Sequence, residues 1–174
     1  SIGGDLKTEK YQFSGGYSQK FKKIIVGAQA SYNAQLGARA RDQFVALPGC
    51  TLTIERIDYF NDIIETSIAE LKRFMDGERT GFKLQGIDDP DVLLWFLWTI
   101  QQYAISTSIE EAANRFCELA ADIISYIRKQ NHPNLFLHNN GLLYTNGTER
   151  PATWMNAVEN GRPITPRTGY VVEI

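Results

Sequence analysis

Apolar side chains recur at three- and four-residue spacing along two stretches of the chain, the pattern of an amphipathic helix. The clearest stretch is 55–75, where charged residues fill the opposite positions. The second stretch runs to about residue 129 and begins at Ser108, with Glu111 three residues later. A serine followed at this spacing by a glutamate resembles a capping box, which satisfies backbone N–H groups at a helix start. The pattern therefore predicts two long amphipathic helices.

Two further stretches predict helices that are less simply amphipathic. An apolar stripe over 41–53 contains Pro48, which removes one backbone hydrogen bond and bends a helix axis. The other begins at the Asp-Asp-Pro of 88–90, which favours a helix start, and continues to Tyr103. It is apolar nearly all round, so we expect it to be buried on every side. We expect the four helices to form two hairpins, the second of which pairs an all-apolar helix with an amphipathic one. Concentric helical rings require this pairing, because the outer ring covers the inner one.

The rest of the chain has no such pattern. Residues 131–170 are punctuated by prolines and glycines. An irregular stretch of this length inside a compact domain is usually functional, so we expect an active-site loop. Residues 1–20 predict a loose polar segment, and 21–32 are compatible with a strand or a helical turn. The chain ends on apolar residues with no stop signal, so we expect 1–174 to be a single, truncated piece of an all-α domain.

Composition narrows the function classes. The net charge of −2 argues against nucleic acid or an anionic membrane as a partner, because both select for basic surfaces. No apolar run is long enough to span a bilayer, and no secretory signal pattern is visible. Cys50 and Cys117 are predicted to be reduced core residues, as in a reducing compartment. The aromatic content of 11% fits stacking on sugar rings as well as packing in a core.

Seven short segments, which fall into four regions, stand out in order along the chain. ALPGCTL at 46–52 follows Ala-Arg-Asp at 40–42, and DVLLWF occupies 91–96. A Gly-Leu-Leu step comes next at 141–143, and then TWMNA at 153–157, ITPR at 164–167 and VEI at 172–174. Together, over about residues 38–174, these segments resemble the amylo-α-1,6-glucosidase domain of glycogen debranching enzymes.

The resemblance implies an (α/α)6 barrel with a sugar site at one end, built from loops between inner and outer helices. It also implies inverting hydrolysis of α-1,6-glucosyl branch stubs on glycogen or maltodextrin, in the cytoplasm and without a cofactor. In that chemistry one carboxylic acid protonates the glycosidic oxygen, and a carboxylate about 6.5–9.5 Å away activates water on the opposite face. We expect no metal site, since His132 and His138 lack further ligands at suitable spacing.

The resemblance places three residues of the predicted helices at the sugar. Arg41 and Asp42 would contact the terminal glucose, and Asp42 is a catalytic candidate. Their alternative is an acidic residue at a helix start beside a surface arginine. Asp91 would also bind the sugar, and its alternative is stabilisation of a helix start.

Four further candidates lie in the C-terminal part. Trp154 would stack on a sugar ring or pack in the core, and Arg167 would pair with a carboxylate or hydroxyl or be a surface loop charge. Glu173 is a catalytic candidate because its apolar neighbours could raise its pKa, and its alternative is a solvated helix start. Asn156 is the third catalytic position, where the family usually has Asp. An amide cannot donate a proton as a carboxylic acid does.

Two departures from the family leave alternatives open. These are Asn156 and the segment YNAQLGAR at 32–39, which replaces a Trp-Gly-rich approach. The chain is then a debranching-type glucosidase, a non-catalytic carbohydrate binder that kept the shape of the site, or a structural fragment of a larger glycoside hydrolase. Because a catalytic base of the family lies well downstream, we expect the isolated chain to be inactive. Uncovered apolar helix faces are expected to promote self-association.

Overall fold

A computed structural model describes residues 38–172 and residue 174. The predictions for 1–20 and 21–32, most of the segment at 32–39, and the catalytic candidate Glu173 lie outside the described residues. The described part is mainly helical, in agreement with the expected all-α class. Its helices are α3 (Ala40–Thr51), the 3-10 helix η1 (Leu52–Ile54), α4 (Ile57–Met75), α5 (Val92–Ser106) and α6 (Ile109–Arg128).

The helices begin and end close to the predicted residues, with two local differences. The clear amphipathic helix begins at Ile57 because Glu55 adopts a left-handed conformation (φ 58°), which separates α4 from η1. The helix predicted from 88–90 begins only at Val92, after a turn. Asp91 is the residue before the first helical turn, but its side chain makes no capping hydrogen bond. The carboxylates at this helix start therefore do something other than cap it.

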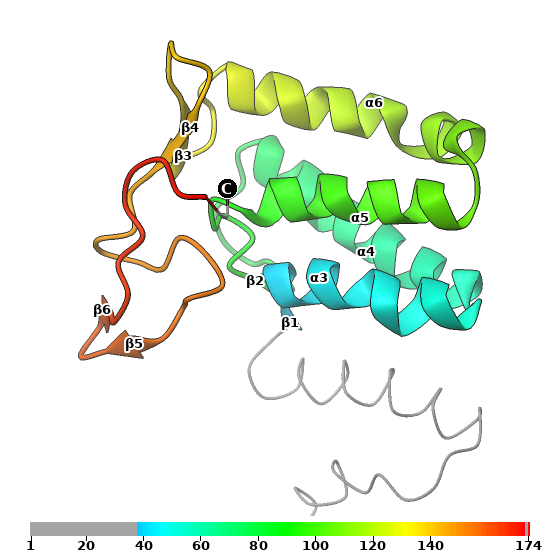
Figure 1. Cartoon of the computed structure of the whole chain (residues 1–174), viewed down its shortest axis with the longest axis horizontal. Coiled ribbons are helices and arrows are strands. Elements are labelled where there is room, and N and C mark those ends of the chain that lie inside the picture. Colours follow the sequence, from blue (N-terminus) through cyan, green and yellow to red (C-terminus); the bar gives the residue numbers. More distant parts are fainter. Residues whose placement is uncertain (1–37, 173) are drawn as a thin grey trace, which may run out of the picture. The chain divides into compact units, whose positions relative to one another are not determined.

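Helix α5 lies at the centre of the helical layer, where it packs against α3 on one side and α6 on the other (Figure 1). Its buried face carries Val92, Leu93, Phe96, Thr99 and Tyr103. Aromatic rings lock this face to its neighbours: Phe96 meets Phe44 of α3 edge-on at 5.3 Å, and Tyr103 stacks on Phe60 of α4 at 5.0 Å.

The opposite face of α5 is not buried, so the prediction that this helix is covered on every side is wrong for the described residues. Leu94, Leu97 and Trp98 are half-buried, and Ile105 is 71% exposed. The apolar content of a helix shows which residues could be buried, but burial also needs a neighbour on each side. The described residues pack against one face of α5 and leave the opposite face partly exposed.

The stretch after α6 is less irregular than its prolines and glycines predict. The strands β3 (Leu135–Leu137) and β4 (Leu143–Thr145) form an antiparallel hairpin, and β5 (Val158–Glu159) pairs with β6 (Arg162–Pro163) in the same way. A bridge joins Thr145 to Gly169. Short strands of two or three residues give too little alternation to be detected in a sequence. A further short sheet pairs β1 (Ala38–Arg39) with β2 (Leu84–Gln85).

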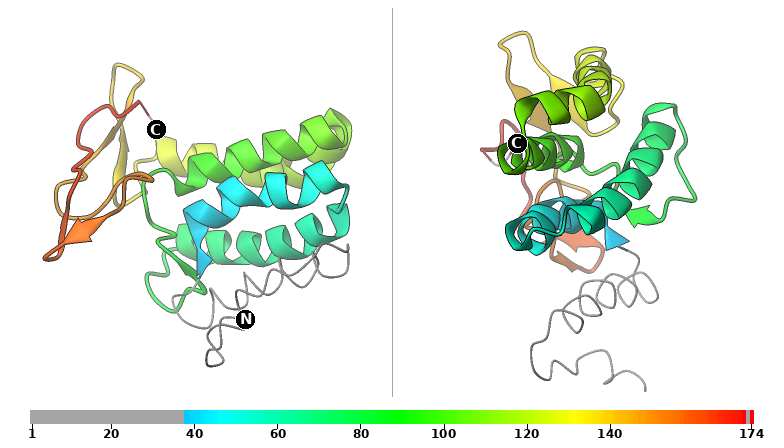
Figure 2. Two further views of the ribbon diagram at one scale, coloured as in Figure 1. Left: turned by 60° about the horizontal axis from the view of Figure 1, so that its bottom comes forward. Right: turned by 90° about the vertical axis from the view of Figure 1, so that its right-hand side faces the viewer.

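This C-terminal stretch lies at the end of the helical layer where α3 and α5 begin (Figure 1). Figure 2 shows the same arrangement from two other directions, with β5 and β6 beyond those helix ends. Within this stretch, the backbones at Gly147 and Arg167 lie very close together. A Cβ at position 147 would come within 2.3 Å of the Arg167 carbonyl oxygen. Only glycine permits so close an approach of two backbone segments.

Two smaller expectations can be compared with the structure. Cys50 and Cys117 are free, but both are exposed and neither is in the core. They lie on the solvent-facing sides of α3 and α6, so the prediction that they are core residues is wrong. Within the described residues, no helix combines the length and apolarity needed to cross a bilayer.

The cap of α6 forms as predicted and gives a direct test. Ser108 Oγ accepts a hydrogen bond of 3.1 Å from the Glu111 N–H. The Glu111 carboxylate, which a full capping box directs back at the serine N–H, accepts from the Tyr103 hydroxyl. We expect Ser108→Ala to lower the free energy of unfolding by about 1 kcal/mol. Urea unfolding measures this, with the exposed Ser106→Ala as control; equal midpoints for the two variants would contradict the cap.

Candidate functional site

Two helix starts meet at the end of the helical layer. The first turn of α3 carries Arg41 and Asp42, and Asp91 precedes the first turn of α5. Because α3 and α5 pack side by side and both begin at this end, residues 50 positions apart in the sequence come into contact (Figure 1). The partial positive charge at the start of each helix favours carboxylates at this place.

Arg41 is the centre of a buried network of charges. Its guanidinium binds the Asp91 carboxylate through two hydrogen bonds, Nε to Oδ2 at 2.6 Å and Nη2 to Oδ1 at 2.8 Å. Nη2 also donates to Asp89 Oδ2 at 3.0 Å. The arginine is only 2% exposed and Asp91 only 1%, so the two groups form a desolvated two-pronged ion pair.

A second arginine extends the network from the other side. Arg150 binds Asp88 through two hydrogen bonds of 2.6 and 3.0 Å, and its Nη2 also donates to Asp89 Oδ1 at 3.2 Å. Asp89 therefore lies between two arginines, one from α3 and one from the stretch after β4. We call the five residues Arg41, Asp88, Asp89, Asp91 and Arg150 the charge ladder.

The pKa shifts within the charge ladder follow from burial and from these contacts. Burial raises the pKa of Asp89, although both arginines favour its charged form. Burial by itself raises the pKa of Asp88 as well. The hydrogen bonds and the charge of Arg150 outweigh this effect, so the pKa of Asp88 is lowered. Burial opposes the charge of Arg41, yet its bonds to Asp91 and the nearby aspartates raise its pKa. Among the described residues, no group of His, Cys, Asp or Glu is arranged to hold a metal ion.

An open hollow of about 610 Å³ lies over this buried ladder. Its lining residues are Arg41, Asp42, Val45, Trp95 and Trp154. Trp95 is held by its indole N–H, which donates to Asp91 Oδ2 at 3.1 Å. Trp154 comes from the stretch after β4 and is 59% exposed. The hollow, which we call the tryptophan hollow, thus combines two indole rings with a carboxylate and a guanidinium.

One nitrogen of Arg41 has no hydrogen-bond partner among the described residues. The five N–H groups of the guanidinium are on Nε, Nη1 and Nη2, and of these nitrogens Nη1 is buried without a hydrogen bond. A buried donor left unpaired costs about 1–3 kcal/mol, so native structures nearly always satisfy it with protein, water or ligand. Because Arg41 lines the hollow, a polar group placed there is suited to accept from it.

The structure brings together three of the residues that the sequence suggested. Arg41, Asp42 and Trp154 line the same hollow, although Trp154 is more than 110 positions from the other two. Asp91 does not line it; its carboxylate lies beneath, bound to Arg41 and Trp95. The structure thus adds contacts with Arg41 and Trp95 to the two alternatives considered for Asp91, a sugar contact and stabilisation of the helix start, which both stay predictions.

The remaining candidates lie elsewhere or next to the hollow. Asn156 is half-buried, and its backbone N–H donates to the Trp154 carbonyl two residues earlier at 2.8 Å. Arg167 is half-buried in the segment that passes Gly147. Neither is among the residues that line the tryptophan hollow.

Sequence reasoning missed Trp95, Asp89 and Arg150 as parts of this site. Trp95 belongs to the DVLLWF segment and to a helix predicted to be buried, but neither feature predicts a role at the site. Its spacing of four from Asp91 places both residues on one face of α5. Asp89 was interpreted as part of a helix start. Arg150 pairs with residues more than 60 positions away, and no local pattern signals such a contact.

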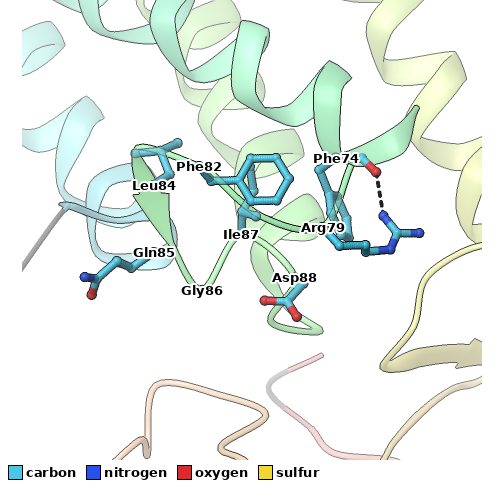
Figure 3. Close-up of a pocket in the computed structure, with 8 residues that line it drawn as sticks. All are labelled: Phe74, Arg79, Phe82, Leu84, Gln85, Gly86, Ile87 and Asp88. Carbon is cyan, nitrogen blue, oxygen red and sulfur yellow. Dashed lines mark hydrogen bonds between the residues drawn. The ribbon is translucent and has the colours of Figure 1, made fainter. Parts of the chain in front are cut away.

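A second, smaller hollow of about 230 Å³ lies beside the charge ladder (Figure 3). Phe74, Arg79, Phe82 and the segment 84–88 line it. Arg79 donates to the Phe74 carbonyl at 3.0 Å, the hydrogen bond drawn in Figure 3. Asp88 is shared, because it lines this hollow and also pairs with Arg150.

Comparison with known proteins gives one match. The family model described as amylo-alpha-1,6-glucosidase matches residues 10–174, which is nearly the whole chain. Searches of curated proteins and of solved structures find no significant match. The matched range includes every residue of the charge ladder and of the tryptophan hollow. Because the match extends well beyond half of the sequence, the chain belongs to the amylo-alpha-1,6-glucosidase family and is a domain related to glycogen debranching enzymes.

Proposed function

We propose that the tryptophan hollow binds the terminal glucose of an α-1,6-linked branch stub on a glycogen-like glucan. The observation that supports this is the convergence of Arg41, Asp42, Trp95 and Trp154 on one open hollow. Sugar rings present an apolar C–H face and a rim of hydroxyl groups. Indole rings pack against such faces, while carboxylate and guanidinium groups bond to the hydroxyls.

The division of roles follows from burial. Asp42 is exposed on the hollow and is suited to accept hydrogen bonds from sugar hydroxyls. Arg41 is fixed by the charge ladder and offers its unpaired Nη1 as a donor. Trp154, at 59% exposure, offers the most accessible aromatic surface. Asp91 holds Arg41 and Trp95 in place, and we assign to it an indirect role in sugar binding.

We further propose that the protein hydrolyses the branch linkage with inversion. That chemistry needs two carboxyl groups far enough apart to admit a water molecule. Asp42, the carboxylate on the hollow, and Glu173 are the candidates within 1–174, while the resemblance places a catalytic base further downstream. Arg167 is suited to pair with a carboxylate or a hydroxyl. In this assignment no metal or cofactor takes part.

The helices fit one part of an (α/α)6 barrel, which we propose as the architecture. Such a barrel surrounds each inner helix with neighbours, and α5, apolar on both faces, has the composition of an inner helix. Its half-exposed residues Leu94, Leu97 and Trp98 are the positions that further helices would cover. Without that cover we expect this face to promote self-association. We place the protein in the cytoplasm, as glycogen metabolism implies.

A second function has its own supporting observation. Asn156, two residues after Trp154, occupies the position where the family usually has Asp, and an amide cannot act as a general acid. If the acid belongs at this position, the protein is a carbohydrate binder that kept the hollow and lost hydrolysis. A purely structural role is the third alternative, and it predicts no sugar binding.

One set of measurements separates these functions. The protein in its full length is mixed with panose, whose terminal glucose is α-1,6-linked, and both glucose release and binding are followed. Release of β-glucose supports the inverting hydrolase; binding without release supports the binder; and the absence of both overturns sugar binding as the function. Asn156→Asp then locates the acid: a gain in rate places it at 156, whereas an unchanged rate places it elsewhere.

Replacing Asp42 tests the hollow itself. We expect Asp42→Ala to weaken panose binding by about ten- to hundredfold, because a charged hydrogen bond to a sugar contributes about 1.5–3 kcal/mol. Isothermal titration calorimetry measures the change. The matched control is Asp62→Ala, which removes an exposed aspartate from α4, outside the hollow. Similar affinities for the two variants would contradict the assigned site.

A further inference from the structure

Arg150 forms hydrogen bonds at the start of α5 although it neither lines the tryptophan hollow nor caps a helix. Its partners are Asp88 and Asp89, which it contacts through three hydrogen bonds. It stands four residues before Trp154 in the sequence. It is therefore the charged group that ties the segment carrying Trp154 to the helix start beneath the hollow.

The chain between Arg150 and Trp154 is held firmly. Ala152 is 1% exposed and Thr153 is fully buried. On the other side of the tryptophan, the Asn156 N–H bonds to the Trp154 carbonyl, and the Met155 N–H bonds to Thr153 Oγ1 at 3.3 Å. Trp154 thus projects from a fixed backbone, with its ring left exposed over the hollow.

The same arginine also acts on Arg41. Asp89 accepts from Arg41 Nη2 on one oxygen and from Arg150 Nη2 on the other, so it fixes the two guanidinium groups relative to each other. With Nε and Nη2 of Arg41 engaged by Asp91 and Asp89, Nη1 is the nitrogen left over. The position of that donor depends on Asp89, and the position of Asp89 depends on Arg150.

From these contacts we propose that Arg150 is a positioning residue of the sugar site. It sets the distance between two groups of the hollow, Trp154 and the Arg41 Nη1 donor. Arg41 is itself part of the charge ladder, and Trp154 follows Arg150 by four residues in the sequence. Its substrate class is that of the proposed function on which the inference rests, a glucan ending in an α-1,6-linked glucose. Arg150 does not touch the sugar in this arrangement.

The test compares Arg150→Met with the wild-type protein for panose binding. Methionine keeps much of the aliphatic length and removes all three hydrogen bonds, so both Trp154 and Asp89 lose a restraint. We expect panose affinity to fall by about tenfold or more, since misplacement of a recognition group by about 1 Å has effects of this size. Arg150→Lys, which keeps the charge but not the fork of donors, is expected to recover part of the affinity.

Arg73→Met is the matched control. Arg73 also bridges two carboxylates, Glu70 at 2.9 Å and Glu78 at 2.5 Å, but it lies on α4 and does not line the tryptophan hollow. A general loss of ion pairs lowers stability in both variants. Only the positioning role lowers panose affinity in Arg150→Met alone, measured at a temperature where circular dichroism shows both variants folded. Equal affinities in the two variants would overturn the inference.

Two further outcomes keep the inference separate from the proposed function. If wild-type protein does not bind panose, the proposed function fails, and the positioning role fails with it. If Arg150→Met does not fold, Asp88→Asn replaces it, since it weakens the two-pronged bond to Arg150 and leaves Asp89 in place. That milder variant is expected to lower panose affinity severalfold, and wild-type affinity in it would overturn the inference.

Discussion

Replacing Arg41 by methionine is expected to lower the free energy of unfolding by about 3–5 kcal/mol, the usual effect of removing one partner from a buried ion pair. The reason is the pair of carboxylates left behind. Asp91 is 1% exposed and Asp89 is 5% exposed, and both lose hydrogen bonds from the same guanidinium. A buried carboxylate without a counter-charge is far less favourable than one in water.

Urea unfolding at pH 7 measures this loss, and an exposed pair provides the control. Arg56 binds Asp58 through two hydrogen bonds of 3.0 and 2.7 Å, the same fork geometry as Arg41 with Asp91. Asp58 is largely exposed, so solvent replaces the lost contact in Arg56→Met. A much smaller loss is expected there. Comparable losses in the two variants would show that burial does not determine the strength of the Arg41 network.

The stability difference between Arg41→Met and wild type is also expected to depend on pH. Without Arg41, the folded-state pKa of Asp89, which burial already raises, rises further above its unfolded value. Protonation then relieves the buried charge, so the variant gains stability relative to wild type as the pH falls from 7 towards 5. Adding Asp91→Asn to Arg41→Met is expected to restore part of the stability at pH 7. A difference between wild type and variant that stays constant with pH would contradict this account.

The long helices could be predicted because their signal is local. In α4 and α6 the apolar residues repeat with the period of the helix, and the Ser108 cap lies within one turn of the residues that it caps. The extent of burial could not be predicted in the same way. The composition of α5 is apolar on all sides, but the packing of α3 and α6 determines which residues are covered, and that packing is not local.

In the site, too, residues within a local motif could be predicted from the sequence, whereas contacts between distant segments could not. Arg41 and Asp42 were found through the resemblance of their segment to a family, and so was Trp154. The sequence did not show that Asp91 would lie under the hollow, because that depends on its partner Arg41 across two packed helices. Arg150 carries no motif at all, and its role follows only from contacts with Asp88 and Asp89. Ion pairs between segments that are distant in the sequence are therefore the part of this site that only the structure reveals.

His132 is the other group with a large expected effect, and it acts on stability. The ring is 1% exposed and packs edge-on against Phe74 at 5.5 Å. Its Nδ1 accepts from the Asn134 N–H at 3.1 Å, so the proton of the neutral ring is on Nε2, which is buried without a partner among the described residues. Burial lowers the pKa of His132 to about 4; Asp88 opposes this shift, and Arg150 and Arg79 add to it.

Acid is therefore expected to destabilise the fold through this residue. Because the folded-state pKa of about 4 lies below the unfolded value of 6.5, the contribution of the neutral ring is complete above pH 6.5 and is lost as the pH falls towards 4. Between pH 7 and pH 4 the loss amounts to about 3 kcal/mol, because a tenfold change in proton affinity corresponds to about 1.4 kcal/mol. Carboxylates add their own pH dependence, so only a comparison with a variant isolates this part.

His132→Asn makes that comparison, because the asparagine side-chain oxygen can accept from the Asn134 N–H in place of Nδ1 and does not titrate. The free energy of unfolding, measured with urea at intervals from pH 7 to pH 4, is expected to fall by about 3 kcal/mol less in this variant than in wild type. The exposed His138, changed to asparagine in the same way, controls for the loss of one imidazole. Parallel curves for wild type and His132→Asn would mean that the buried ring accepts a proton without a penalty. The packing against Phe74 would then have to open in the folded state.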